Sequence, residues 1–292
     1  PQRSGCSSGA GGPDADVIVS VVVDPLDDFD ARPFTFEGRT RRVFWKGEGP
    51  AVIVMAEIPG ITPRVADFAR RVVDLGCTVA LPSLFGRPGR DPGLGYSLRS
   101  LVPACVSREF QAFALAPEST PVSRWLRALA AGAHVTCGGP GVGAVGMCFT
   151  GGFALAMMVD ECLVAPVLSQ PSLPIGVSRR ARSALGLGET ALAAVRTRVA
   201  AGTEVLGLRF TCDRLVPAER FARLRAELGD AFIGVEIDSS PGNPWGIPRT
   251  AHSVLTEHLV DEPGHPTREA LQQVLTFLRE RLVDSAGAPP AA

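Results

Sequence analysis

Lysine is almost absent from this 292-residue chain: Lys46 stands alone among 29 basic residues, and arginine supplies the others. The 30 acidic residues bring the formal net charge to −1. No block of basic residues stands out, which argues against nucleic acid as a partner. No run approaches the roughly 18 consecutive apolar residues of a membrane helix, so the sequence does not predict a membrane partner either.

Metal-binding and disulfide patterns are also missing. The seven cysteines form no C-x-x-C pair and show no zinc-ligand spacing, and the four histidines join no cluster of carboxylates. We therefore expect neither a metal nor an organic cofactor. An odd number of cysteines without a disulfide pattern favours a reducing compartment, and residues 1–16 lack the apolar segment of a signal peptide. The sequence thus predicts a cytoplasmic protein, and it does not indicate the oligomeric state.

The chain does contain an alternation of strand-like and helix-like patterns, which is typical of an α/β protein with a mostly parallel central sheet and helices on both faces. We expect one domain over residues 17–283 between flexible tails at 1–16 and 284–292, with 86–118 as a cap over the mouth of the site. The expected strands are 17–23, 42–45, 51–56, 78–81, 142–147, 163–168, 205–210 and 231–237. The expected helices are 63–75, 120–131, 149–159, 189–200, 217–228 and 267–282, the last with Thr267 as its N-cap.

Cys148 lies on the turn between the strand 142–147 and the helix 149–159. A side chain on such a sharp turn stands above the sheet, and the helix that follows stabilises an anion at its N-terminus. Because the thiolate is the reactive form of cysteine, this position favours a nucleophile. The alternative is a buried structural cysteine at a tight turn.

An acid and a histidine follow Cys148 in the chain order of α/β-hydrolases. Asp213 comes just after the strand 205–210, and His252 follows the strand 231–237. Acid and base lie after successive late strands in that fold, so the three residues form a candidate catalytic triad. Taken singly, Asp213 could cap the next helix, and His252 could be a surface loop residue.

At this point the chain resembles the dienelactone hydrolase family, a cysteine-nucleophile branch of the α/β-hydrolases. The resemblance runs from about residue 43 to 282, and it implies the α/β-hydrolase fold. It is carried by Glu57-Ile58-Pro59-Gly60, by Pro82-Ser83-Leu84-Phe85-Gly86-Arg87, by Gly146-Met147-Cys148-Phe149-Thr150-Gly151-Gly152, by Asp213 and by Ala251-His252-Ser253.

The resemblance implies a role for each of four side chains. Glu57 would accept the proton of the Cys148 thiol when substrate enters, and the thiolate would form an acyl-thioester that water then hydrolyses. His252 would shuttle protons, and Asp213 would orient it and stabilise its charge. The oxyanion hole would be formed by the backbone N–H groups of Ile58 and Phe149.

One departure from the family concerns the substrate. In the family, an arginine after the Pro-Asp-Leu loop and a second arginine four positions after the histidine hold a substrate carboxylate. Arg87 matches the first and Ser253 is kept, but Thr256 stands at the second position and Ser83 replaces the aspartate. A less anionic ester, lactone or thioester is therefore at least as good a candidate as a dienelactone.

The sequence thus predicts a hydrolase of small esters or lactones that acts through an acyl-thioester on Cys148. Two alternatives stay open: a catalytically idle family member that binds a ligand or responds to redox conditions through Cys148, and an acyltransferase that passes the same acyl group to an acceptor other than water.

Overall fold

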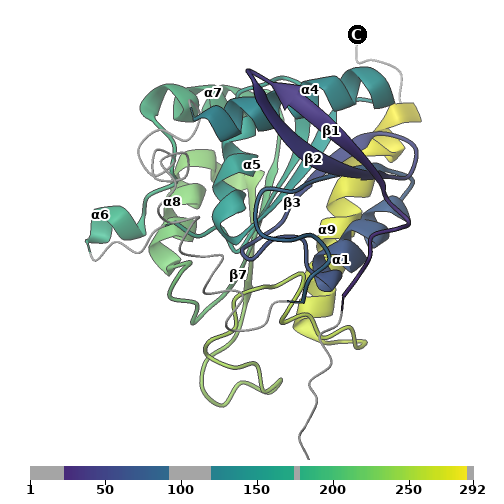
Figure 1. The fold of residues 1–292 in the computed structure, drawn as a ribbon. Helices are drawn as coiled ribbons and strands as arrows, with labels where there is room; N and C mark the ends of the chain where they lie inside the picture. Colours follow the sequence, from purple (N-terminus) through teal and green to yellow (C-terminus); the bar gives the residue numbers. More distant parts are fainter. Residues whose placement is uncertain (1–22, 92–119, 174–177, 288–292) are drawn as a thin grey trace, which may run out of the picture.

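The computed structural model describes residues 23–91, 120–173 and 178–287, and within them eight strands form a single sheet (Figure 1). Its order is β1-β2-β4-β3-β5-β6-β7-β8. The pairs β1/β2 and β2/β4 are antiparallel, and all the others are parallel. The strands are β1 (Asp30–Phe36), β2 (Arg39–Lys46), β3 (Ala51–Met55), β4 (Thr78–Pro82), β5 (Val142–Met147), β6 (Leu163–Ser169), β7 (Val205–Phe210) and β8 (Phe232–Ile237).

Helices cover both faces of the sheet (Figure 1). Side chains of α1 and α9 belong to one apolar core, and those of α4, α5, α7 and α8 belong to another on the opposite face. The bounds are α1 (Pro63–Val73), α4 (Pro121–Cys137), α5 (Gly151–Met157), α6 (Arg179–Arg182), α7 (Glu189–Ala200), α8 (Ala218–Leu228) and α9 (Pro266–Leu282), with short 3-10 turns at Cys148–Thr150, Gly229–Ala231 and Asp284–Gly287. These layers confirm the predicted α/β class with a mostly parallel sheet.

The strand β3 shows how one short sequence supplies both cores. Val52 and Val54 belong to the core beneath α1 and α9, whereas Ile53 and Met55 belong to the other core. Successive side chains of a strand point to opposite faces, so a strand buried on both sides is apolar throughout. All five residues of β3 are buried, so packing on both faces holds this strand in place.

Two of the helices begin at signals visible in the sequence. Thr62 caps α1 by accepting a hydrogen bond from the N–H of Val65, and Thr120 caps α4 in the same way. The predicted cap of α9 was wrong: His265 is the N-cap, and its side chain accepts a hydrogen bond from the N–H of Thr267. The helix α9 begins at Pro266, because the fixed φ and the missing N–H of proline suit the first helical position.

Other boundaries also differ from the prediction. Residues 30–36 form the edge strand β1, which the sequence did not reveal because its side chains lie largely exposed and lack apolar alternation. The predicted strand 17–23 lies outside the described residues except for Val23, which forms an isolated bridge with Arg90. Most of the predicted cap, from residue 92 onward, is likewise outside them. The predicted C-terminal tail begins with the 3-10 turn Asp284–Gly287.

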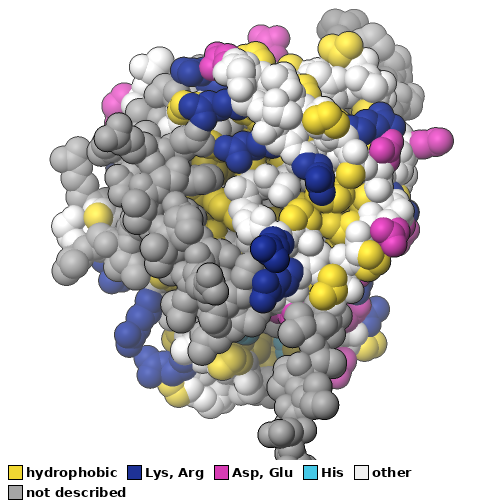
Figure 2. All heavy atoms as spheres, viewed as in Figure 1, with side chains coloured by type: hydrophobic (Ala, Val, Ile, Leu, Met, Phe, Trp, Pro, Cys, Tyr) yellow, Lys and Arg dark blue, Asp and Glu magenta, His cyan; other side chains and the backbone are white. Residues whose placement is uncertain are grey.

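Basic side chains are spread among apolar and uncharged ones on the face shown in Figure 2. Several arginines of the described residues form ion pairs, for example Arg124 with Glu37 and Arg127 with Asp160. No helix among residues 23–91, 120–173 and 178–287 is long and apolar enough to cross a membrane.

We predict that β5 tolerates no side chain at Gly146, next to the turn that follows the strand. A Cβ there would lie 2.2 Å from the carbonyl oxygen of Thr150 and 2.8 Å from the Cα of Gly151, and neither backbone atom can yield cheaply. Gly146→Ala should lower the free energy of unfolding by about 1–3 kcal/mol, as overpacking does in other cores. Urea unfolding measures this change.

Gly143→Ala on the same strand is the matched control. Its Cβ would meet ends of flexible side chains such as Leu282, at 3.0 Å or more. Equal destabilisation by the two substitutions would contradict the prediction.

Candidate active site

Cys148 adopts a backbone conformation that is rare for a residue with a side chain. Its φ is 56°, and it lies where β5 ends and the 3-10 turn Cys148–Thr150 begins. Holding a non-glycine residue in this left-handed region costs about 1–3 kcal/mol unless the surroundings enforce it. The predicted sharp turn is therefore observed at this position, and the nucleophilic role of Cys148 stays a prediction.

Thr150 ties this turn to the neighbouring strand. Its buried hydroxyl lies 2.8 Å from the carbonyl oxygen of Met55 and accepts a hydrogen bond from the N–H of Met147. Because β3 and β5 are parallel neighbours, their carboxyl ends meet at one edge of the sheet. Cys148 and Glu57, the residues just beyond those two ends, therefore lie on adjacent loops.

Glu57 is buried and is held by hydroxyl groups. The hydroxyl of Thr256 donates to Oε1 at 2.6 Å, and that of Ser253 donates to Oε2 at 2.7 Å. The side-chain amide of Gln170 lies 3.4 Å from Oε2. In the described part of the chain, no arginine or lysine forms an ion pair with Glu57. A buried carboxylate needs hydrogen-bond donors, and the hydroxyl groups of Thr256 and Ser253 supply them here.

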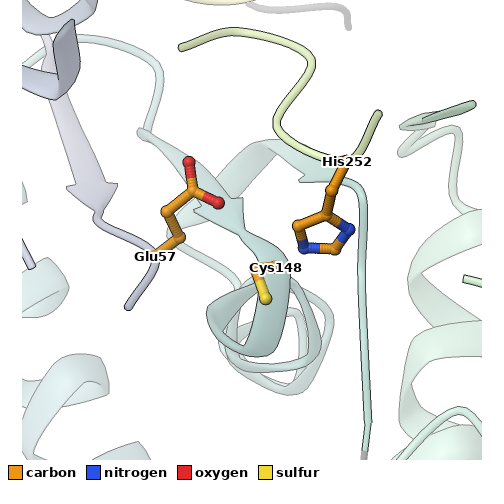
Figure 3. Close-up of side chains that lie close together, drawn as sticks. All are labelled: Glu57, Cys148 and His252. Atoms are coloured by element: carbon orange, nitrogen blue, oxygen red, sulfur yellow. The ribbon is translucent and has the colours of Figure 1, made fainter. Parts of the chain in front are cut away.

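The imidazole ring of His252 is held in place by Asp213. Nδ1 of the ring lies 2.6 Å from Oδ2 of Asp213, whose Oδ1 accepts a hydrogen bond from the N–H of Leu215. Within the described residues, Nε2 of His252 is buried and has no hydrogen-bond partner. One atom each from the side chains of Glu57, Cys148 and His252 lies within 4.8 Å of the other two (Figure 3).

The surroundings of His252 raise its pKa to about 11. Burial, the largest single contribution, lowers the pKa, but the negative charge of an ionised Cys148 and the hydrogen bond and charge of Asp213 together outweigh it. Since this pKa lies above the ordinary value of 6.5, the imidazolium stabilises the fold fully below pH 6.5, and the stabilisation is lost as the pH rises towards 11.

The structure also places the remaining predicted residues. Ile58 directly follows Glu57 and Phe149 directly follows Cys148, so the two N–H groups expected to form an oxyanion hole come from the ends of adjacent strands. Arg87 is exposed in the loop after β4. The oxyanion hole and the role of Arg87 in substrate binding stay predictions.

Ser253 has a contact that the sequence did not indicate. Its hydroxyl donates to Glu57, and the expected role of Ser253 in substrate binding stays a prediction. A neighbouring histidine, His258, has a similar supporting place: its Nδ1 lies 3.2 Å from the N–H nitrogen of Ser253 and 3.4 Å from that of His252. Burial, the largest contribution, lowers the pKa of His258, which favours the neutral ring that can accept these bonds.

Two further polar residues at the site escaped the sequence analysis. Ser172 has its hydroxyl oxygen 2.8 Å from the sulfur of Cys148, and Gln170 accepts a hydrogen bond from the N–H of Val254 while its amide faces Glu57. The one available signal was their position, because polar residues directly after a buried strand such as β6 lie at the edge where the other strands end.

Thiolate, imidazole and carboxylate are also the ligand types that zinc prefers. The group formed by Glu57, Cys148 and His252 is the one that could hold a metal ion in the described part of the chain. Residue spacing along the chain could not have revealed it, since the three side chains come from distant loops. The absence of a metal cofactor stays a prediction.

We predict that His252 owes much of its raised pKa to Cys148. Cys148→Ala removes the neighbouring negative charge and leaves Asp213 in place, so the pKa of His252 should fall clearly below 11. A pH titration of the ring by NMR spectroscopy, with the other three histidines assigned, measures the difference. An unchanged titration of His252 in the variant would show that the thiol is not its electrostatic partner.

Comparison with known proteins gives the same fold. Residues 37–280 match the model of the dienelactone hydrolase family. A dienelactone hydrolase-like promiscuous phosphotriesterase from metagenomic libraries is 16% identical, with 87% of this chain and 99% of that chain covered and a TM-score of 0.58. The dienelactone hydrolase of Anabaena variabilis is 16% identical, with 87% and 98% covered and a TM-score of 0.57.

A putative dienelactone hydrolase from Klebsiella pneumoniae is 18% identical, with 85% of this chain and 98% of that chain covered and a TM-score of 0.56. No curated protein sequence matches the chain. The family match spans most of the chain, and the structural likeness supports the same α/β-hydrolase fold. This chain therefore belongs to the dienelactone hydrolase family, a family of hydrolases.

Proposed function

We propose that the protein hydrolyses small neutral esters or lactones through a thioester on Cys148. The observation that carries the proposal is the approach of Glu57, Cys148 and His252 to within 4.8 Å at the end of the sheet, with Asp213 bonded to the far side of the histidine ring. A nucleophile, a base and a group that orients the base form the minimal set for acyl transfer. The family match supports ester hydrolysis at the general level.

The first half of the reaction forms the acyl-enzyme. Glu57 accepts the thiol proton as substrate enters, and the Cys148 sulfur bonds to the carbonyl carbon. The carbonyl electron pair moves onto oxygen, where the N–H groups of Ile58 and Phe149 stabilise the charge. Collapse of this intermediate breaks the ester bond, and the leaving alkoxide takes a proton from the imidazolium of His252.

The second half returns the enzyme to its starting state. Neutral His252 takes a proton from water as the oxygen of that water attacks the thioester carbonyl. The new intermediate collapses, expels the Cys148 thiolate and releases the carboxylic acid. The thiolate then recovers its proton from Glu57. Asp213 holds the imidazole ring in place throughout and stabilises the imidazolium.

The partners of Glu57 support a neutral substrate. Thr256, at the position where the family has its second arginine, donates its hydroxyl to Glu57, and it is only 1% exposed. A buried hydroxyl already committed to Glu57 offers no positive charge to a substrate carboxylate. Of the two positions that hold the carboxylate in the family, only that of Arg87 still carries an arginine, and one exposed arginine holds a carboxylate weakly.

Cys148→Ala should abolish hydrolysis of short-chain p-nitrophenyl esters, because no other nucleophile replaces the sulfur in the mechanism. Release of p-nitrophenol, followed for the wild type and the variant, measures this loss. Equal activity in the two proteins would place the active site elsewhere. Activity in neither would favour a binding protein, and ester consumption that depends on an added alcohol or amine would favour an acyltransferase.

A paired lactone assay completes this test. A neutral lactone and the same lactone bearing a carboxylate are compared by kcat/KM, and the neutral one should be the better substrate. A clear preference for the carboxylate-bearing lactone would overturn the substrate class and leave the nucleophile in place.

A further inference from the structure

The short segment Ser169–Ser172, here called the β6 loop, contacts the sulfur of Cys148, the carboxylate of Glu57 and the loop that carries His252. Ser172 approaches the sulfur of Cys148, and Gln170 lies between Glu57 and the backbone of Val254. The mechanism above assigns no task to this loop. Its contacts are nevertheless the ones that would determine where the sulfur points before it attacks.

Ser172 is bonded to Cys148 twice. Its backbone N–H donates to the carbonyl oxygen of Cys148 at 3.0 Å, and its hydroxyl oxygen lies 2.8 Å from the sulfur. The side chain is buried, at 6% exposure. A thiolate has no proton to give, so once Cys148 is ionised the hydroxyl must be the donor. Hydrogen bonds to an ionised acceptor are roughly twice as strong as neutral ones.

The chain holds Ser172 in this place at some conformational cost. Gln170 has a φ of 37°, in the left-handed region that disfavours residues with side chains. Its backbone N–H donates to the carbonyl oxygen of Leu208 on β7, and the side-chain oxygen is bonded to the hydroxyl of Ser169. These bonds commit the loop to a single path away from β6.

A second anchor lies on the following residue. The buried guanidinium of Arg220 on α8 donates to the carbonyl oxygen of Pro171 at 2.9 Å and to that of Leu215 at 3.0 Å. Pro171 in turn lies against the turn that carries Cys148, since a Cβ added to Gly151 would come within 2.8 Å of its Cα. The hydroxyl of Ser172 is therefore aimed at the sulfur by contacts of the two residues that precede it, Gln170 and Pro171.

We propose that Ser172 is a further catalytic residue, whose hydroxyl donates a hydrogen bond to the Cys148 thiolate and stabilises this anion before attack. The proposal rests on the proposed function for its role in catalysis. As the thioester forms, the sulfur loses its charge and the bond weakens, so the hydroxyl stabilises the free thiolate more than the acyl-enzyme. Its effect should appear in the ionisation of the thiol and in kcat/KM at neutral pH.

Alkylation tests the proposal without any ester substrate. The rate at which iodoacetamide modifies Cys148 is measured from pH 5 to 10 by mass spectrometry of the peptide that contains it. Loss of one hydrogen bond to a charged group should move the midpoint of this profile upward by about one to two pH units in Ser172→Ala. Ser172→Thr, which keeps a hydroxyl, should restore the wild-type midpoint.

Ser123→Ala on α4 is the matched control, because it removes another buried serine hydroxyl, one bonded to that of Thr120. It should leave the midpoint unchanged. Ser172→Gly removes the same hydroxyl and gives a second measurement if the alanine variant fails to fold. An unchanged midpoint in a folded Ser172 variant without the hydroxyl would overturn the proposal.

The two proposals fail separately in these experiments. A wild type that hydrolyses esters, combined with an unshifted midpoint, removes Ser172 from the mechanism and leaves the proposed function intact. A shifted midpoint in a protein without hydrolytic activity keeps the hydrogen bond to the sulfur and removes the proposed function.

Discussion

The left-handed backbone at Cys148 is the constraint on which the rest of the site depends. At a φ of 56°, the chain leaves β5 abruptly and puts the sulfur at the edge where the parallel strands end. That conformation persists because Thr150 bonds to β3, and because Gly146 and Gly151 let backbone segments come closer than a Cβ would allow. Every other member of the site is placed relative to this sulfur.

Charge is the second constraint, because several ionisable groups are buried around the sulfur. Asp213 faces His252, and Glu57 is satisfied by hydroxyls. Burial lowers the pKa of Arg220 to about 10, and the negative charge of Asp213 opposes part of this shift. An arginine with that pKa keeps its charge at neutral pH. The positive charges of Arg220 and His252 thus offset carboxylates that would be costly to bury alone.

The sequence predicted those parts of the site that depend on local pattern. Glycines around Cys148 indicated the turn, and chain order pointed to Asp213 and His252, which lie 2.6 Å apart. The resemblance to the family implied that Glu57 would act on the Cys148 thiol, and the structure brings the two side chains together where parallel strands end at one edge of the sheet.

The parts that the sequence did not reveal depend on tertiary contacts between polar residues of ordinary type. Nothing in the pattern around Ser172 distinguishes a serine that touches a thiol from one exposed to solvent. Thr256 was noticed only as the loss of an arginine, and its bond to Glu57 became visible when distant loops were brought together. The edge strand β1 was missed for a related reason, since an exposed strand carries little apolar alternation.

Intact-protein mass spectrometry of an acid-quenched reaction tests the central claim most directly. With a small ester whose acyl group is released slowly, the wild type should gain the mass of one acyl group, and fragmentation should locate it on Cys148. Turnover of that ester without any adduct on Cys148, or with the acyl group on another residue, would contradict the account.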